Sequence, residues 1–546
     1  MILPQRLSKQ SRQTLDLIRI KNGIIFDILV FLIGCLSFVF SWIESSVNLD
    51  SHHWGFMYAQ ALDIKRGLVP HKDALIAYGY LTTWIQGISL SLFGERLISI
   101  GIMTSIFYSL SLFLSYRIFL KFLPKYISFF SVCTIFLLHG YIIYPWANYF
   151  SYTFELLSLL LFFGETISIK NIFSSGFFLG LSFLCRYSSI PAILPPFCML
   201  LFFNPLLQKE PGEQMFNKTP FFIGGFLTPV ILFFLLLIYE GGLSDFFIQN
   251  KAIATSFGRI SSVSTLIFFP IKLVLLRTII HDGRAPEFRS FLLTINFFFS
   301  LLTLLYFYNA SFRKKLSTRE NIVLSSCLVT LFGYLNSVHI YDMFRLVNGS
   351  SLGIGIAAYV LMETFRMPIP SDEPWKKRYV KTLILMSVFF TYIILVCTLL
   401  FKEISSAVVP WSLDILTVKE VKTAEISMFQ GKILSKTYSD FYRDVYRVIS
   451  KFGPYYYIIN YTIDPIVAVI NDLPRVQFSS FYLPSLAKAY PKESERIQQI
   501  INSRKAIILS TKDLQIPGYK VWAVVGGDFY ISVPETAPLP ASPPSP

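Results

Sequence analysis

Long apolar runs separated by short polar or basic segments fill residues 24–401. A run of about 17 to 22 apolar residues is long enough to cross a bilayer as a helix. Such runs occupy residues 24–43, 97–118, 127–144, 152–169, 172–187, 189–203, 220–239, 289–308, 321–338, 347–364 and 380–401. This pattern predicts a polytopic α-helical membrane protein with about 11 transmembrane helices. Because the runs 172–187 and 189–203 are short, they form either two crossings or one re-entrant hairpin.

The pattern changes to mixed polar and apolar residues after the last run. Apolar residues at helical spacing over 441–449 predict an amphipathic helix. Residues 506–509 and 522–525 read as strands, and the second is followed by a Gly-Gly-Asp turn into a further apolar stretch. We therefore expect a small extracytoplasmic α/β domain over 402–533 and a disordered, Pro-rich tail over 534–546.

Basic side chains mark one side of the predicted membrane domain. Residues 1–23 are basic and precede the first span without a small-residue cleavage site, which predicts a cytoplasmic tail and a retained signal anchor. Loops assigned to the same side carry Lys121, Lys125, Lys170, Lys209, Lys218, Arg313, Lys314, Lys315, Arg319, Arg366, Lys376, Lys377 and Arg378. The positive-inside rule then places loops 44–96 and 240–288 and the C-terminal domain outside the cytoplasm, on a multi-pass protein of the cell (inner) membrane.

Composition supports the membrane class and narrows the function. Hydrophobic residues make up 53% and charged residues 15% of the 546 residues, and the mean hydropathy is +0.55. The formal net charge of +15 comes from the basic loops, so no nucleic-acid partner is expected. The six cysteines lie in apolar segments without CxxC spacing, which argues against a disulfide framework or a zinc site.

The first outer loop concentrates polar groups close to a predicted membrane surface. Asp50 follows the first span by a few residues and is the candidate general base, with helix capping near His52 as the alternative. Asp73 closes a Gly-x-x-Pro-x-x-Asp segment and has the pattern of a turn residue. His52, His53 and His71 are candidates for phosphate or metal binding, but their irregular spacing also suits polar surface residues. No cofactor is expected, and a divalent metal is not indicated.

Basic residues at the outer ends of spans are candidates for binding an anion. Arg186 lies at the tip of the apolar hairpin, where an unpaired guanidinium is costly, so it either binds a lipid-linked phosphate or snorkels to head groups. Arg345 and Lys251 are further candidates for the donor phosphate. His339 and Asp342 lie in the same polar turn as Arg345, where Asp342 and Arg345 form an internal pair in the alternative interpretation.

These features together resemble a known family. A basic tail, a first span, an Asp soon after it, the Gly-x-x-Pro-x-x-Asp segment and a closing Leu92-Phe-Gly94 resemble the first outer loop of the C-superfamily (GT-C) of membrane glycosyltransferases. The likeness is to the protein O-mannosyltransferase and aminoarabinose transferase kind (family 39-like). Residues 175–187 resemble its Gly-x-x-x-Gly-Leu-x-x-x-x-Arg/Lys hairpin, and 242–247 its next outer loop. The resemblance covers about residues 20–400.

The resemblance implies a function and a site. It implies inverting transfer of a sugar from a polyprenyl phosphate to a hydroxyl of a lipid, glycan or protein acceptor outside the cytoplasm. Asp50 matches the aspartate assigned as base, and Arg186 matches the basic residue after the hairpin. Two positions depart from the family pattern, because Ser51 stands where many relatives have a second acid and His71 replaces an aromatic residue.

Three other interpretations remain open from the sequence. A transporter or flippase of lipid-linked sugars is the main rival from another class, although no internal repeat supports it. A polymerase or ligase of lipid-linked glycans is the rival among enzymes. A purely structural membrane protein would not require the outer basic residues.

Overall fold

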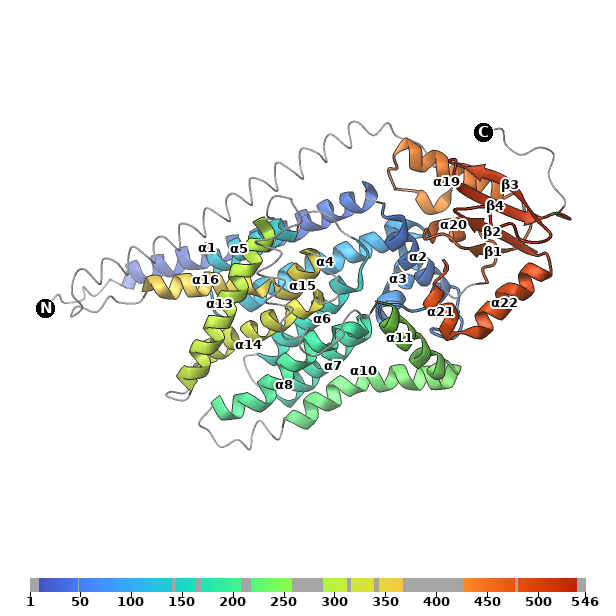
Figure 1. Ribbon diagram of the computed structural model, residues 1–546. Coiled ribbons are helices and arrows are strands. Elements are labelled where there is room, and N and C mark those ends of the chain that lie inside the picture. The colour runs from blue at the N-terminus through green and yellow to red at the C-terminus, as the bar shows by residue number, and fades with distance from the viewer. Residues whose placement is uncertain are drawn as a thin grey trace.

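The computed structural model describes residues 9–47, 49–139, 144–163, 168–207, 218–257, 288–311, 316–337, 343–366, 426–476 and 480–537. It has a long helical part and a smaller sheet-bearing part at one end (Figure 1). The helical part contains α1 (Lys9–Val47), α4 (Leu97–Phe119), α5 (Lys125–His139), α6 (Ala147–Phe162), α7 (Ile169–Cys185), α8 (Ile190–Leu207), α10 (Thr219–Glu240), α13 (Phe288–Ser311), α14 (Thr318–Gly333), α15 (Met343–Ser350) and α16 (Leu352–Arg366).

Ten of the eleven predicted apolar runs fall on these helices, and the run 380–401 lies outside the described residues. By length and composition, three described helices are able to cross a membrane: Ile24–Val47, Leu97–Phe119 and Thr219–Glu240. The pair α7 and α8 passes the same test jointly but bends by 120° at the break, as a broken span or re-entrant loop does. Several other runs form shorter apolar helices, so the number of about 11 crossings stays a prediction.

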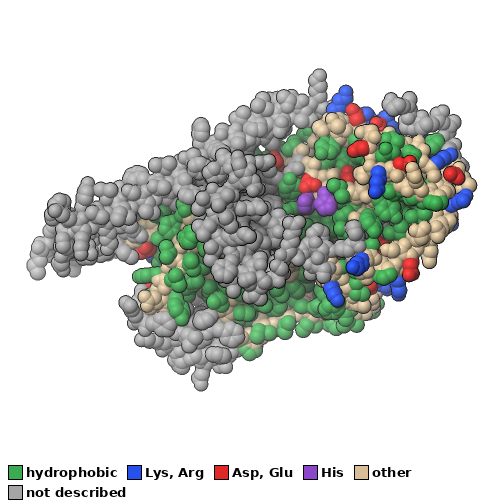
Figure 2. Space-filling model, in the orientation of Figure 1, with side chains coloured by type: hydrophobic (Ala, Val, Ile, Leu, Met, Phe, Trp, Pro, Cys, Tyr) green, Lys and Arg blue, Asp and Glu red, His purple; other side chains and the backbone are tan. Residues whose placement is uncertain are grey.

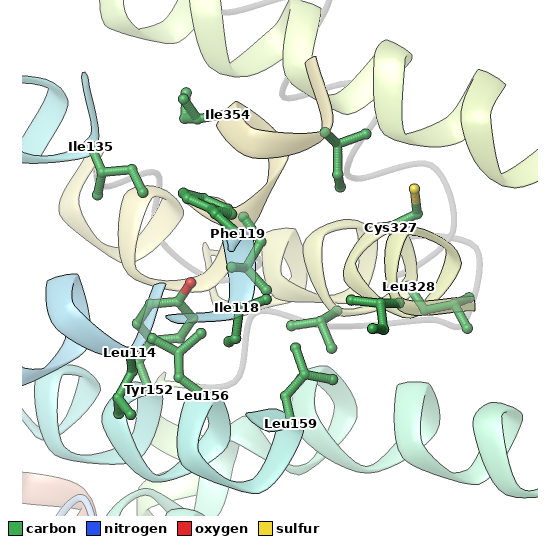
Figure 3. Packing of buried hydrophobic residues seen from close by; sticks show 14 of the residues in the cluster. Leu114, Ile118, Phe119, Ile135, Tyr152, Leu156, Leu159, Cys327, Leu328 and Ile354 are labelled. Atoms are coloured by element: carbon green, nitrogen blue, oxygen red, sulfur yellow. The ribbon is translucent and has the colours of Figure 1, made fainter. Parts of the chain in front are cut away.

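One large apolar cluster holds the helical part together. It is formed by buried side chains of α4 to α8 and α13 to α16, such as Phe119, Leu156 and Leu328 (Figure 3). Since apolar side chains gain little from leaving lipid, close packing must supply much of the helix association. Gly176 and Gly180 of α7 allow this against α10, because an added Cβ would lie 2.1 Å from the Phe222 carbonyl oxygen and 2.5 Å from that of Phe226.

The predicted outer loops contain helices of their own. Loop 44–96 folds into α2 (Ser51–Lys65) and α3 (Tyr80–Phe93), and loop 240–288 begins with α11 (Leu243–Phe257). Both α2 and α3 lie between the helical part and the sheet (Figure 1). The sequence indicated α2 only through the alternative role of Asp50 as a helix cap near His52. It missed α3, which is shorter than a span and shows no polar periodicity.

The C-terminal part is a four-stranded sheet with helices on both faces. Its elements are η4 (Ser427–Phe429), α19 (Lys436–Ile449), β1 (Tyr457–Asn460), α20 (Ile466–Val469), α21 (Pro484–Ala489), α22 (Pro491–Asn502), β2 (Ala506–Ser510), β3 (Tyr519–Val525) and β4 (Phe529–Pro534). The strand order is β1-β2-β4-β3, with β1 parallel to β2 and the other two pairs antiparallel. Alternate residues point to opposite faces, so Ile458 packs in the cluster with α19 and Ile459 in the cluster with α22.

The larger of these two clusters also includes α2, which joins the first outer loop to the sheet. Trp54, Phe56 and Met57 belong to the same buried cluster as Tyr442 and Ile531. At Gly55 an added Cβ would lie 2.8 Å from the backbone nitrogen of Ile466, so α2 and α20 are in direct contact. The buried Asp63 pairs with Arg475 across the same interface.

The predicted disordered tail begins too early. Pro534 pairs with Tyr519 at the end of β4, and the Glu535 backbone N–H donates to the Gly518 carbonyl at 3.0 Å. Ala537 is buried in the cluster that contains α2 and α19. The Pro-rich composition concealed this because one strand-end pair and one small apolar side chain leave little trace in sequence. Residues 538–546 lie outside the described part.

Candidate active site

The residues predicted to act on a substrate come from three places in the chain. They lie at the start of α2, at the sharp bend after α7 and at the start of α15. Of these elements, α2 lies next to the sheet and α15 lies within the helical part (Figure 1). On the face shown in Figure 2, histidine side chains lie beside acidic ones next to hydrophobic surface.

Asp50 caps α2 and at the same time binds a histidine. Its Oδ1 accepts the backbone N–H groups of His52 at 3.0 Å and His53 at 3.3 Å. Its Oδ2 lies 2.5 Å from His53 Nδ1, which donates because a carboxylate only accepts. The two roles proposed for Asp50, capping residue and catalytic carboxylate, are therefore compatible. One oxygen serves each.

The environment keeps Asp50 ionised. Burial raises the pKa of this carboxyl, but the hydrogen bond and charge of His53 and the two backbone N–H groups outweigh it, so the pKa lies below its usual value. With Nδ1 bound to a carboxylate, a neutral His53 carries its lone pair on Nε2. About a third of each side chain is exposed, 33% for Asp50 and 30% for His53, so solvent and substrate can reach the pair.

An aromatic wall connects His53 to Arg345. The imidazole centroid lies 4.8 Å from the ring of Trp146 and 6.0 Å from that of Tyr144. The Arg345 guanidinium carbon lies 4.4 Å from the centroid of the same Trp146 ring, within cation–π range. Both His53 and Arg345 thus contact Trp146, whereas Asp50 is attached to His53. The contacts therefore run from the Asp50 carboxylate through the imidazole and the indole to the guanidinium.

Arg186 is buried beside Arg345. Its side chain is 3% exposed and donates to the Asn336 side-chain oxygen at 3.1 Å and to the Asn336 carbonyl at 3.4 Å. Within the described ranges, no carboxylate lies within ion-pair distance of Arg186. It lines a small polar cavity of about 10 Å³, which has room for about one water molecule. Two neighbouring guanidinium groups repel each other, so an anion between them would be stabilised strongly.

Tyr78 lies within electrostatic range of Asp50, Arg186 and Arg345. Burial raises its pKa, the two arginines lower it and Asp50 raises it again, with a net pKa above the usual value. The neighbouring backbone fixes this position, because the Tyr187 N–H donates to the Tyr78 carbonyl at 3.0 Å. Asp50 and two of the three proposed phosphate-binding cations, Arg186 and Arg345, therefore lie within electrostatic range of one tyrosine.

Gly79 explains how the first outer loop reaches the end of α7. An added Cβ at this position would lie 2.4 Å from the Cys185 carbonyl oxygen, so only glycine permits the contact. The Thr82 hydroxyl donates to the same carbonyl at 2.9 Å. The first outer loop is thus held directly against the residue before Arg186.

Residues of the C-terminal part contact the start of α2. His52 Nδ1 donates to the Ile463 carbonyl at 3.1 Å, and its ring lies 5.0 Å from the ring of Phe481. Asp464 lies near Asp50 and accepts from the Tyr442 hydroxyl at 2.7 Å. Burial, with a further contribution from Asp50, raises the pKa of Asp464 to about 6.

The remaining predicted site residues have different outcomes. Asp73 is exposed and accepts the Val69 N–H at 3.1 Å, which fits a turn residue. His71 is buried and donates from Nδ1 to the Gln249 side-chain oxygen at 2.8 Å. Lys251 has an exposed side chain on α11, so its role at the phosphate stays a prediction.

Two predicted site residues and the predicted absence of a metal site remain to be compared with the structure. His339 and Asp342 lie outside the described residues. In the described part of the chain, no group of three or more His, Cys, Asp or Glu side chains is placed to hold a metal ion.

The sequence analysis missed several residues of the site, namely Tyr78, Tyr144, Trp146, Asn336, Tyr442 and Asp464. Trp146 carried a usable signal, because a tryptophan at the end of a span often marks the membrane interface. Tyr442 and Asp464 carried none, because they lie about 400 residues after Asp50 and meet it only through the fold.

Comparison with solved structures finds the same fold, whereas comparison of the sequence with family models and curated proteins finds no match. No protein-family model matches the chain, and no curated protein sequence matches it. The structure of ArnT from Cupriavidus metallidurans bound to undecaprenyl phosphate superposes with a TM-score of 0.54 at 10% identity, over 92% of this chain and 97% of that chain. The apo form of ArnT gives the same TM-score and identity over 94% and 98%.

A third structure is the Archaeoglobus fulgidus oligosaccharyltransferase in complex with Zn and sulfate. It superposes with a TM-score of 0.50 at 12% identity, over 88% of this chain and 68% of that chain. Identities this low show the fold alone. The chain has a GT-C-like fold, as the order of motifs in its sequence predicted.

Proposed function

We propose that this protein is a multi-pass membrane glycosyltransferase. It transfers a sugar from a polyprenyl phosphate to an acceptor hydroxyl on the extracytoplasmic face, with inversion. The observation that carries the proposal is the chain of contacts from the Asp50–His53 pair through the Trp146 ring to Arg345, with the buried Arg186 nearby. An inverting transfer requires a proton acceptor on one side of the sugar and cations at the leaving group on the other.

The two arginines form the leaving-group side. Arg186 is buried without a carboxylate partner among the described residues, close to Arg345. A phosphate monoester carries the oxygens that a planar guanidinium binds best, and it neutralises the repulsion between the two cations. The similar ArnT structure holds undecaprenyl phosphate, which supports a lipid phosphate as the anion.

The Asp50–His53 pair forms the acceptor side. His53 Nε2 takes the proton of the acceptor hydroxyl, and the acceptor oxygen forms a bond to the anomeric carbon of the sugar. At the same time the bond between the anomeric carbon and the phosphate oxygen breaks. The released electron pair stays on the lipid phosphate, where Arg186 and Arg345 stabilise it. Asp50 holds Nδ1–H and stabilises the imidazolium that forms. Asp50 is then the positioning carboxylate, and the imidazole replaces the aspartate as base.

Binding of undecaprenyl phosphate tests the leaving-group side directly. We expect the full-length protein in nanodiscs to bind this lipid and Arg186→Gln to weaken binding about 10- to 100-fold, because a charge-assisted hydrogen bond is lost. Arg66→Gln is the matched control, since Arg66 is exposed and pairs only at the surface with Glu95 and Asp472. Equal binding by the wild type and Arg186→Gln refutes the proposed phosphate site.

A further inference from the structure

A groove with a volume of about 650 Å³ lies on the C-terminal part, and neither Arg186 nor Arg345 lines it. It is bordered by Tyr461, Tyr482, Gln498, Thr511, Lys512 and Gln515, together with apolar residues. Its volume is within the range of sites that bind small organic ligands. Nothing in the proposed donor chemistry uses it.

The position of the groove in the sheet favours ligand binding. Strands β1 and β2 are parallel and are joined by a crossover that contains α20, α21 and α22. Tyr461 directly follows β1 and Thr511 directly follows β2, so the groove opens at the carboxyl ends of both strands. In α/β units this edge is where ligands bind, because side chains of successive loops converge there.

The lining suits a carbohydrate. The rings of Tyr461 and Tyr482 lie 5.3 Å apart and offer apolar faces to the C–H faces of a sugar ring. Gln498, Gln515 and Thr511 supply groups that both donate and accept hydrogen bonds, as sugar hydroxyls require. Among the lining residues that the structure describes, Lys512 is the single charged side chain.

The backbone of Gln515 is held in an unusual conformation at the rim. Its φ is +48°, a left-handed value that is uncommon outside glycine, and its N–H donates to the Asp513 side chain at 3.0 Å. Such backbone strain gathers at ligand sites, where the surrounding structure maintains it.

The groove and the candidate active site share two segments of chain. Tyr461 is two residues before Ile463, so the Cα atoms of Tyr461 and Ile463 are at most about 7 Å apart. The Ile463 carbonyl accepts a hydrogen bond from His52. Tyr482 is adjacent to Phe481, whose ring contacts His52. The loops after β1 and before α21 therefore contribute both to the groove and to the contacts of His52.

We propose that this groove binds the carbohydrate part of the acceptor. This inference rests on the proposed function and names the substrate class on the acceptor side: a glycan or glycolipid of more than one sugar, held by stacking on Tyr461 and Tyr482.

In the test, membranes from cells whose copy of the gene is deleted supply the acceptor. The full-length protein is added with lipid-linked donor, and sugar transfer to the acceptor is measured. The double change Tyr461→Ala and Tyr482→Ala should raise the KM for acceptor about tenfold or more, with the KM for lipid-linked donor unchanged. Undecaprenyl phosphate binding should also be unchanged. Tyr455→Ala is the matched control, because this tyrosine is 81% exposed and precedes β1 outside the groove.

A second variant changes only exposed side chains, so a folding defect cannot explain its effect. Gln498→Ala with Lys512→Ala alters two exposed side chains of the groove and should likewise raise the acceptor KM. An unchanged acceptor KM in this variant, with wild-type transfer intact, overturns the groove assignment. Absence of any transfer by the wild type instead refutes the proposed function, so the two failures are distinguishable.

Discussion

Replacing Asp50 by Asn separates its two structural roles. Asparagine keeps one oxygen that accepts the N–H groups of His52 and His53, and Asn is as good an N-cap as Asp. The stability of the protein should therefore change by less than about 1 kcal/mol. The group that replaces Oδ2 is an amide NH₂, which cannot accept a hydrogen bond from His53 Nδ1.

The loss in rate follows from the imidazole tautomer. Facing an NH₂ group, Nδ1 becomes the acceptor and the proton moves to Nε2, the nitrogen that must be free to take the acceptor proton. General-base catalysis contributes about 10²- to 10⁴-fold, and the wrong tautomer removes it, so the transfer rate should fall by this factor.

The assay compares initial rates of sugar transfer by Asp50→Asn and by wild-type protein in nanodiscs, with melting temperatures recorded in parallel. Asp73→Asn is the matched control, because it makes the same chemical change at an exposed turn of the same loop. Transfer by folded Asp50→Asn within about threefold of the wild-type rate would refute the role of the Asp50–His53 pair, since it is asked to supply at least about 10²-fold.

Three further predictions concern the framework of the site. Asp63→Ala leaves the guanidinium of Arg475 buried without its carboxylate and should cost about 3–5 kcal/mol, measured as a lower melting temperature; an unchanged value would contradict the role of this pair. Gly180→Ala forces α7 away from the Phe226 carbonyl and should cost about 1–3 kcal/mol and weaken undecaprenyl phosphate binding, whereas Gly224→Ala, with open space around it, should do neither. Asp464 has a raised pKa of about 6, so ionising it opposes folding: wild-type stability should fall as pH rises from about 4 to 6 and stay lower above. Asp464→Asn lacks this titration, so its melting temperature relative to wild type should be higher at pH 8 than at pH 4; an equal difference at both pH values would contradict the assignment.

Hydrophobic periodicity predicted the helical part well, and it predicted little of the site. Apolar runs located ten helices because burial in lipid or in a helical core imposes the same composition. The strand β1 escaped prediction because it has only four residues and precedes a polar turn. Helix α2 was indicated only by the possible cap at Asp50, and α3 escaped because its buried residues include polar ones and form no apolar stripe.

The candidate site was partly predictable through charge and partly not. Asp50 and Arg186 stood out because charged groups at the ends of apolar spans are costly without a purpose. His53 was one of several histidines with irregular spacing, and only the contact of Nδ1 with Asp50 distinguishes it from His52 and His71. The approach of Asp464 to Asp50 depends on the C-terminal part folding onto α2, a long-range contact that no local pattern encodes.

The most direct measurement follows a labelled sugar from donor to acceptor. Purified full-length protein in nanodiscs receives a polyprenyl-phosphate sugar labelled in the sugar ring, together with membranes that supply the acceptor. The account predicts that label enters the acceptor through an inverted linkage and that one polyprenyl phosphate is released for each sugar transferred, with both signals lost in His53→Gln. Translocation of the intact lipid-linked sugar without cleavage, or cleavage at the same rate in His53→Gln, would contradict it.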